Sequence, residues 1–165
     1  MSASQDLVAH IPRLRRYARA LTRDANLADD LVQDTLERAL LKLDLWRPAS
    51  DLRAWLFTLM HNIHVNRVRS RRPPGVALEE AFDVAASDGP MDAMAVLDLH
   101  AALMRLPEEL RAVVLLVGLE QFAYAEAAGI LGLPVGTVMS RLSRGRERLR
   151  QILAGEPAVK LKVVK

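Results

Sequence analysis

The 165-residue sequence predicts an all-α protein made of two small helical domains, an N-terminal helical bundle and a C-terminal helix-turn-helix domain, joined by a flexible acidic linker. Apolar residues recur at helical spacing in both halves of the chain, and 51% of the residues are hydrophobic, which is enough to build real cores. Residues 73–91, PPGVALEEAFDVAASDGPM, lack sustained periodicity and are bounded by Pro and Gly. We therefore expect domains at residues 1–72 and 92–165, with the linker between them.

Two amphipathic helices open the first domain. Residues 7–21 predict an Arg-rich helix, and Asp24 is a suitable cap for a second helix at about 27–43. Opposite its apolar face, this second helix carries five polar residues: Asp29, Asp30, Gln33, Asp34 and Glu37. The helix dipole stabilises acids in the first turn by about 0.3–1 kcal/mol each, which accounts for the first two but not the last two. A docking surface for a basic partner is the alternative interpretation.

A long third helix is expected from Leu52 to about Arg72, after a turn in which Ser50 or Asp51 can act as the cap. The helix is rich in arginine and aromatic residues and also carries two asparagines, Asn62 and Asn66. Such a helix could read unstacked bases, because base stacking on an aromatic side chain contributes about 1–3 kcal/mol. The alternative is that its aromatic residues, Trp55 and Phe57, belong to the core.

The second domain is expected to begin with a helix from about Asp92 to Leu106, followed by one at residues 110–119 that Pro107 and two acids introduce. Residues 124–150, YAEAAGILGLPVGTVMSRLSRGRERLR, then combine a short Ala-rich helix, a Gly-Leu-Pro break and a helix with five arginines. Gly132 permits a sharp turn there. This order is typical of a helix-turn-helix motif, whose second helix lies in the DNA major groove. The tail from Gly155 is expected to be frayed.

Periodicity separates two faces on the last helix. One stripe packs inward: Val138, Leu142, Gly145 and Leu149. Other faces carry residues able to touch a ligand: Thr137, Ser140, Arg141, Arg144 and Arg148. The alternative is a plain solvated arginine face, since most charge runs are of that kind. Because only Glu147 offsets the five arginines and a helix-turn-helix leads into them, we expect duplex DNA to be the partner.

Charge is distributed unevenly within a net charge of +3. Residues 1–72 hold 13 basic and 8 acidic side chains, residues 73–91 hold 4 acidic and no basic ones, and residues 92–165 hold 10 basic and 8 acidic ones. The acidic linker is therefore either a passive spacer or a segment that occupies a positively charged channel.

Composition also excludes several classes of protein. The sequence contains no cysteine, so it has no disulfide scaffold, no Cys-ligated zinc and no thiol redox switch. Its longest apolar run, residues 112–119, is far shorter than the roughly 20 residues that span a bilayer, so we expect a cytoplasmic protein without membrane insertion. His61 and His64 lie three residues apart without a third convergent ligand, and we expect no catalytic residue, metal, cofactor or small-molecule substrate.

Four ordered motifs give the chain a family resemblance: DDLVQDT (29–35), LRAWLF (52–57), LPEELR (106–111), and PVGTV with SRL (134–138 and 140–142). Over nearly everything from Leu7 to Leu153, the chain resembles the extracytoplasmic-function group of bacterial RNA polymerase sigma factors. The resemblance implies a dissociable subunit that binds core RNA polymerase and directs it to a limited set of promoters. It also implies a stress or environmental regulon and control by an anti-sigma factor.

The same resemblance implies a role for each surface. The acidic face around Asp34 would dock on the clamp helices of the polymerase's largest subunit, and the acidic linker would thread the RNA path. The loop at 47–52 and the helix behind it would trap a flipped base of the downstream promoter element, through Arg53, Trp55, Asn62, Asn66 and Arg67. The upstream promoter element would meet the last helix, with arginines on guanine edges or phosphates, through Thr137, Ser140, Arg141, Arg144 and Arg148.

Four positions depart from what is common in this family. His61 stands where Arg is common, Asn66 where Asp is common, and Met139 where a basic residue is common. Ala123 replaces a serine that caps the first helix of the helix-turn-helix motif. Losing such a cap costs about 1 kcal/mol, unless Glu126 compensates. Promoter preference at Met139 therefore stays open.

Besides an enzyme, two other functions are alternatives to a sigma factor. A repressor or activator that binds DNA unaided as a dimer accounts for residues 124–150 but leaves the acidic helix and the Trp55 region without a task. A helical adaptor or scaffold protein would bind no promoter DNA even with polymerase present.

Overall fold

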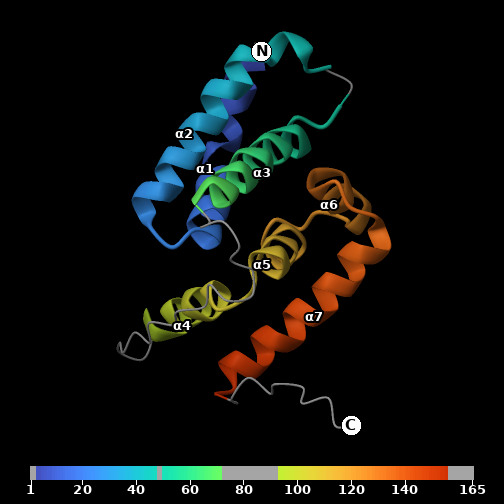
Figure 1. Ribbon diagram of the computed structural model, residues 1–165. Coiled ribbons are helices and arrows are strands. Elements are labelled where there is room, and N and C mark those ends of the chain that lie inside the picture. Colours follow the sequence, from blue (N-terminus) through green and yellow to red (C-terminus); the bar gives the residue numbers. More distant parts are fainter. Residues whose placement is uncertain (1–2, 48–49, 72–92, 156–165) are drawn as a thin grey trace.

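A computed structural model describes residues 3–47, 50–71 and 93–155, and every regular element within those ranges is helical. The first domain contains α1 (Ala3–Leu21), α2 (Ala25–Leu41) and α3 (Leu52–Arg71), with a short 3₁₀ turn at Leu43–Leu45. In Figure 1, α1 and α2 lie side by side and α3 crosses them. The prediction of three long helices is confirmed, although α1 begins four residues earlier than expected and α2 ends two residues earlier. The predicted linker and most of the tail lie outside the described residues.

Local hydrogen bonds explain where two of these helices begin. The Asp24 carboxylate accepts a hydrogen bond from the backbone N–H of Asn26 at 2.8 Å and caps α2. The Asp51 carboxylate accepts one from the backbone N–H of Arg53 at 3.0 Å at the start of α3. Each bond satisfies a backbone donor that a helix leaves unpaired in its first turn, so both predicted caps are confirmed.

The second domain contains α4 (Ala93–Met104), α5 (Glu108–Val114), α6 (Tyr124–Leu131) and α7 (Val135–Leu153). The single helix expected at residues 110–119 is instead α5 followed by a π-helical turn at Leu115–Leu119. Two residues after this turn, Gln121 has a φ of 58°, which lies in the left-handed region. The irregular end of the helix directs Glu120 and Phe122 toward the first domain.

The turn between α6 and α7 has the geometry of a helix-turn-helix. Gly132 ends α6 with a φ of 66°, which glycine adopts without steric cost, and the backbone N–H of Leu133 bonds back to the carbonyl of Ala128 at 3.0 Å. Pro134 is the last residue before α7. At the start of α6, Ala123 offers no side-chain cap, but the Glu126 carboxylate accepts its backbone N–H at 3.0 Å. Glu126 therefore supplies one of the two bonds of a capping box, while the bond that a serine at position 123 would supply is missing.

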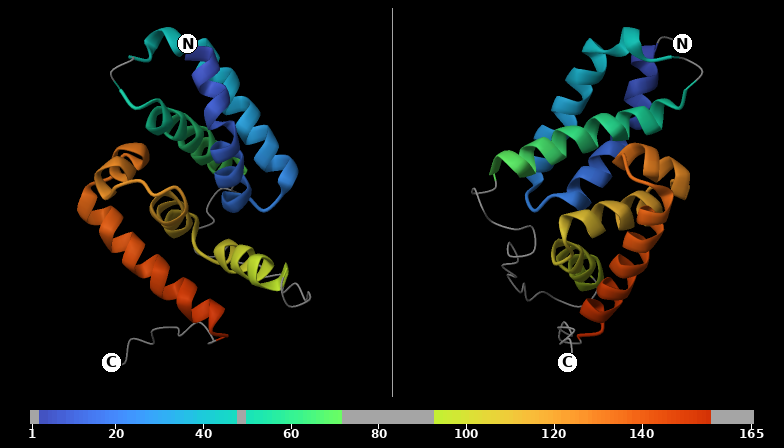
Figure 2. Two further views of the ribbon diagram at one scale, coloured as in Figure 1. Left: turned by 180° about the vertical axis from the view of Figure 1, so that it is seen from behind. Right: turned by 45° about the vertical axis from the view of Figure 1, so that its right-hand side comes forward.

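The two domains pack against each other in the described form, rather than standing apart on a tether (Figure 2). Their buried apolar residues form one continuous cluster. A row of aromatic rings crosses the boundary: Tyr17 meets Phe57 edge to face with ring centroids 5.1 Å apart, and Phe57 meets Phe122 of the second domain at 5.2 Å. Phe57 is therefore a core residue, the second of the two alternatives considered for it.

Candidate polymerase and nucleic-acid interfaces

The acidic residues of α2 share one solvent-facing side of the helix. Asp29, Asp30, Gln33 and Glu37 are exposed, whereas Asp34 is half-buried beside Arg67 of α3, with which it forms an ion pair. The opposite side of α2 is buried in the first domain and anchors the helix, through Ala28, Leu31, Val32, Thr35 and Ala39. Four of the five predicted polymerase contacts are thus exposed. Among them, Asp29 lies 3.9 Å from the Arg19 guanidinium, and the Gln33 amide donates to the Glu37 carboxylate at 3.3 Å.

The five residues predicted to contact the downstream promoter element divide between two sides of α3. Trp55, Asn62 and Asn66 fall on one stripe, because their spacing of 7 and 4 residues brings side chains back to the same face. The two asparagines are exposed, and Trp55 is half-buried against the core. The two arginines, Arg53 and Arg67, lie on the other side of the helix. The structure therefore brings three of the five residues together.

Both of these arginines have partners inside the molecule. The Arg53 guanidinium lies 4.0 Å from the centre of the Phe122 ring and donates to the backbone carbonyl of Glu120 at 3.4 Å. Arg67 pairs with Asp34, as described above. A nucleic acid could reach these two guanidinium groups only after the groups leave their present partners.

The predicted DNA face of α7 is largely open to solvent. Ser140, Arg144 and Arg148 are exposed, and Thr137 is half-buried. Arg141 is the exception, with 23% of its side chain exposed and Glu109 at 3.8 Å. The opposite stripe packs on α5 as predicted, because Val138, Leu142 and Gly145 are buried and Leu149 is half-buried. This stripe fixes which side of α7 faces a ligand.

A cleft of about 790 Å³ lies between α3 and the helices α5, α6 and α7. Asn62 and Asn66 line it from the first domain, and Arg141, Glu109 and Gly132 line it from the second. Residues predicted to read two different promoter elements therefore face the same narrow space.

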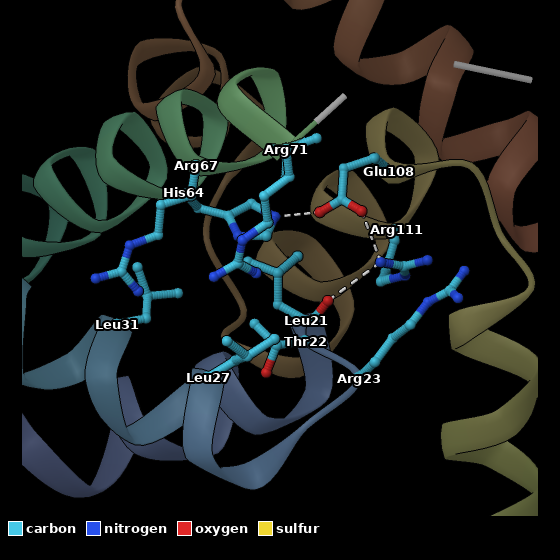
Figure 3. Close-up of a pocket in the computed structure, with 11 residues that line it drawn as sticks. Leu21, Thr22, Arg23, Leu27, Leu31, His64, Arg67, Arg71, Glu108 and Arg111 are labelled. Atoms are coloured by element: carbon cyan, nitrogen blue, oxygen red, sulfur yellow. Dashed lines mark hydrogen bonds and ion pairs between the residues drawn. The ribbon is translucent and has the colours of Figure 1, made fainter. Parts of the chain in front are cut away.

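Glu108 occupies a polar centre between the domains (Figure 3). One of its carboxylate oxygens bonds to the His64 ring of α3, and the other accepts from Arg111 at 2.7 Å. Burial would raise the pKa of Glu108, but the hydrogen bond from His64 and the charge of Arg111 outweigh it and hold that pKa below its usual range. Nearby His61 is kept neutral, because burial and the His64 charge lower its pKa to about 4.

Arg111 is buried, and all of its donor nitrogens are used. Besides Glu108 it donates to backbone carbonyls at 2.7–3.1 Å, those of Leu21, Leu103, Met104 and Leu106. The bond to Leu21 reaches into the first domain, so Arg111 ties the end of α1 to the start of α5. An arginine inside the apolar stretch LRAVVLL was the sequence signal for such a buried network.

Glu120 forms a second polar contact between the domains. Its side chain is fully buried, and its carboxylate accepts from the Nε and Nη2 of Arg16 at 3.2 and 3.1 Å. Arg53 closes over the same residue through the backbone carbonyl, as described above. Sequence reasoning assigned no role to Arg16 or Glu120, because nothing in a pattern of spacings relates residues 104 positions apart.

No group of three or more His, Cys, Asp or Glu side chains in the described ranges is arranged to hold a metal ion. Within the same ranges, no helix is both long and apolar enough to cross a membrane.

Family models match both domains. The model for the sigma2 domain of PhyR matches residues 7–61, and the model for region 4 of sigma-70 matches residues 97–149. The chain is 38% identical over 154 residues to the ECF RNA polymerase sigma factor EcfG of Rhodopseudomonas palustris, an alignment that covers 92% of this chain and 85% of that protein.

Solved structures share the fold. The chain is similar to the sigma factor RpoE of Bartonella quintana, determined in complex with the anti-sigma factor NepR, with a TM-score of 0.75 and 36% identity over 93% of this chain and 97% of that one. The anti-anti-sigma factor PhyR of the same organism, also solved with NepR, has a TM-score of 0.62 at 21% identity over 91% of this chain and 50% of that one. The second likeness concerns the fold alone.

Proposed function

This chain belongs to the extracytoplasmic-function family of RNA polymerase sigma factors, and we propose that it binds core RNA polymerase and directs it to a limited set of stress or environmental promoters. The observation that carries the proposal is the helix-turn-helix of α6 and α7. Its buried stripe around Gly145 leaves Arg144 and Arg148 exposed on the other side of α7. The protein acts by binding, and no catalytic residue or cofactor is proposed.

The two domains have different roles in this function. Residues 1–72 dock on the polymerase and read the downstream element, residues 92–165 read the upstream element, and residues 73–91 connect them. The exposed acids of α2 support the docking role, because four polar residues on a well-anchored helix offer a surface complementary to a basic partner. We expect the clamp helices of the largest polymerase subunit to be that partner.

DNA recognition divides between α3 and α7. On α7, arginines that reach guanine edges contribute about 1–3 kcal/mol each, and Thr137 and Ser140 add contacts to bases or phosphates. On α3, the stripe of Trp55, Asn62 and Asn66 accepts an unstacked base of the downstream element. Arg53 and Arg67 join it by binding the phosphate backbone once they leave their internal partners.

An anti-sigma factor restrains the protein. The related RpoE was solved with the anti-sigma factor NepR, and the similarity extends over almost the full length of both chains. We extend this mode of control to the present chain. Because the proposed function requires polymerase on the chromosome, we expect the protein to act in the cytoplasm.

A second candidate function follows from the match to the sigma2 domain of PhyR. A sigma-like protein that only captures an anti-sigma factor needs no DNA-reading helix. The exposed arginines of α7 favour the sigma factor over that alternative.

In vitro transcription with core polymerase over a promoter library tests the proposal. The expected result is initiation from a small subset of promoters, and its loss with Arg144→Ala and Arg148→Ala. A chain that shows no affinity for sigma-free core polymerase would refute the function.

A further inference from the structure

Two exposed apolar side chains on α7 have no role in the proposed function. Val135 begins the helix and is 41% exposed, and Met139, one turn later, is 51% exposed. Both lie outside the buried stripe that holds α7 on α5. At about 100° per residue, the two side chains are about 40° apart around the helix, so they form one apolar strip. Ser140 and Arg144, which the proposed function assigns to DNA, lie farther round the exposed side.

The charges around this apolar strip indicate what kind of partner it fits. Residues 135–146 contain three arginines and no acidic residue. A partner of this part of α7 must therefore offer negative charge together with an apolar group. Duplex DNA offers both in its major groove, because phosphates line the groove walls and thymine presents its C5-methyl group on the floor. Thymine is the only one of the four bases with a methyl group there.

The position of the strip on α7 suits contact with bases. The helix runs along the outer edge of the second domain (Figure 1), and the N-terminal residues of the second helix in a helix-turn-helix are those that contact base edges. A helix with its side chains is about 10–12 Å across, close to the groove width of about 12 Å, so side chains on both flanks reach the bases. Val135 and Met139 are about 6 Å apart along the helix axis, against about 3.4 Å between successive base pairs. The strip therefore spans about two base pairs.

We propose that Val135 and Met139 read thymine by its C5-methyl group, so that the upstream element carries one or two A·T pairs opposite the first two turns of α7. This base preference rests on the proposed function and makes it more specific. The flexible thioether of Met139 adapts to the position of a methyl group, whereas the stiff side chain of Val135 offers a fixed contact. Burial of one methyl group in such a contact corresponds to about a fourfold gain in affinity.

Deoxyuridine tests the contact, because it pairs with adenine as thymine does and lacks only the C5-methyl group. Promoters selected from the transcription library are synthesised with deoxyuridine at each thymine of the upstream element in turn. The full chain in complex with core polymerase is then titrated with each duplex. We expect deoxyuridine at one or two positions to weaken binding by the parent about fourfold each. The Val135→Ala/Met139→Ala variant, changed only at exposed positions, should bind thymine and deoxyuridine duplexes equally.

Three further variants separate thymine reading from a general loss of affinity. Leu153→Ala is the matched control, because Leu153 ends the same helix and is 50% exposed, and it should discriminate as the parent does. Met139→Leu keeps an apolar side chain and should keep the discrimination. Met139→Arg adds a cation near the phosphates, so it should retain affinity but lose discrimination at the position that Met139 reads.

The results that overturn thymine reading differ from those that overturn the proposed function. An upstream element without thymine, or a change below twofold at every thymine, refutes the methyl contact. Discrimination that persists in Val135→Ala/Met139→Ala also refutes it, since another group would then read the methyl. Initiation at selected promoters that is indifferent to the methyl group leaves the proposed function intact. A parent that initiates at no promoter of the library refutes the proposed function and the thymine contact together.

Discussion

The crossing of α5 and α7 allows the effect of Gly145→Ala to be worked out from the structure. A Cβ at this position would lie 2.7 Å from Cγ2 of Val114 and 3.4 Å from the carbonyl oxygen of Leu110. Val114 is buried and β-branched, so its side chain cannot swing aside freely. Alanine in a helix interior gains about 0.5–1 kcal/mol over glycine, but overpacking costs about 1–3 kcal/mol. We expect the free energy of unfolding to fall by about 1 kcal/mol.

A double-mutant cycle in urea, followed by circular dichroism, isolates the contact. Val114→Ala alone costs about 2 kcal/mol for two buried methyl carbons. In the double variant, the new methyl group at position 145 enters the space that Val114 vacates, so the combined cost is smaller than the sum by about 1–2 kcal/mol. Gly129→Ala in α6 is the control, because no atom lies within 4 Å of its Cβ, and it should stabilise the protein by about 0.5–1 kcal/mol. Additivity of the two changes within about 0.5 kcal/mol would contradict the packing argument.

Four further predictions concern single positions. Ala123→Ser supplies the missing cap of α6 and should raise stability by about 0.5–1 kcal/mol, seen as a higher Tm; an unchanged Tm would mean that Glu126 already satisfies this helix end. Asp30→Arg should weaken binding to core polymerase about tenfold or more by placing like charges face to face, while exposed Asp44→Arg should not; equal effects would refute the docking face. Arg144→Ala should cost about 1–3 kcal/mol in initiation at promoters that carry the upstream element, and equal loss at promoters without it would contradict the assignment. The pKa of His61 is lowered from 6.5 to about 4, so the unfolded chain takes up a proton at a higher pH than the folded protein does, and the free energy of unfolding falls by up to about 3 kcal/mol as pH drops from 6.5 to 4. His61→Gln should flatten that part of a stability–pH profile. An unaltered slope would exclude this histidine as its source.

Features that depend on neighbours in the chain were predictable. The caps at Asp24 and Asp51, the turn at Gly132 and the hydrogen bond from the Ala123 N–H to Glu126 each involve groups within a few residues of one another, so spacing alone identifies them. The buried stripe of α7 follows in the same way from helical periodicity.

Features that depend on the meeting of the domains were not predictable. The sequence expectation for Glu108 was a favourable position at a helix N-terminus, which is a local effect of about 0.3–1 kcal/mol. In the structure the same carboxylate joins two domains through His64 and Arg111. The π-helical turn at Leu115–Leu119, where a plain helix was expected, also serves a tertiary contact, since it leads to Glu120 and Phe122.

Different sides of helix α3 have different roles. Arg53, Phe57 and His64 recur at intervals of 4 and 7 residues and meet the second domain at Glu120, Phe122 and Glu108. Asn62 and Asn66 lie on a different stripe of the helix and are exposed at the cleft between α3 and the second domain. Promoter reading and domain packing are therefore separable by substitution. Asn62→Ala should change promoter choice with little change in Tm, whereas His64→Ala, which leaves Glu108 without its partner, should lower Tm at constant promoter choice. If both substitutions altered both properties together, the division of α3 into a reading side and a packing side would be wrong.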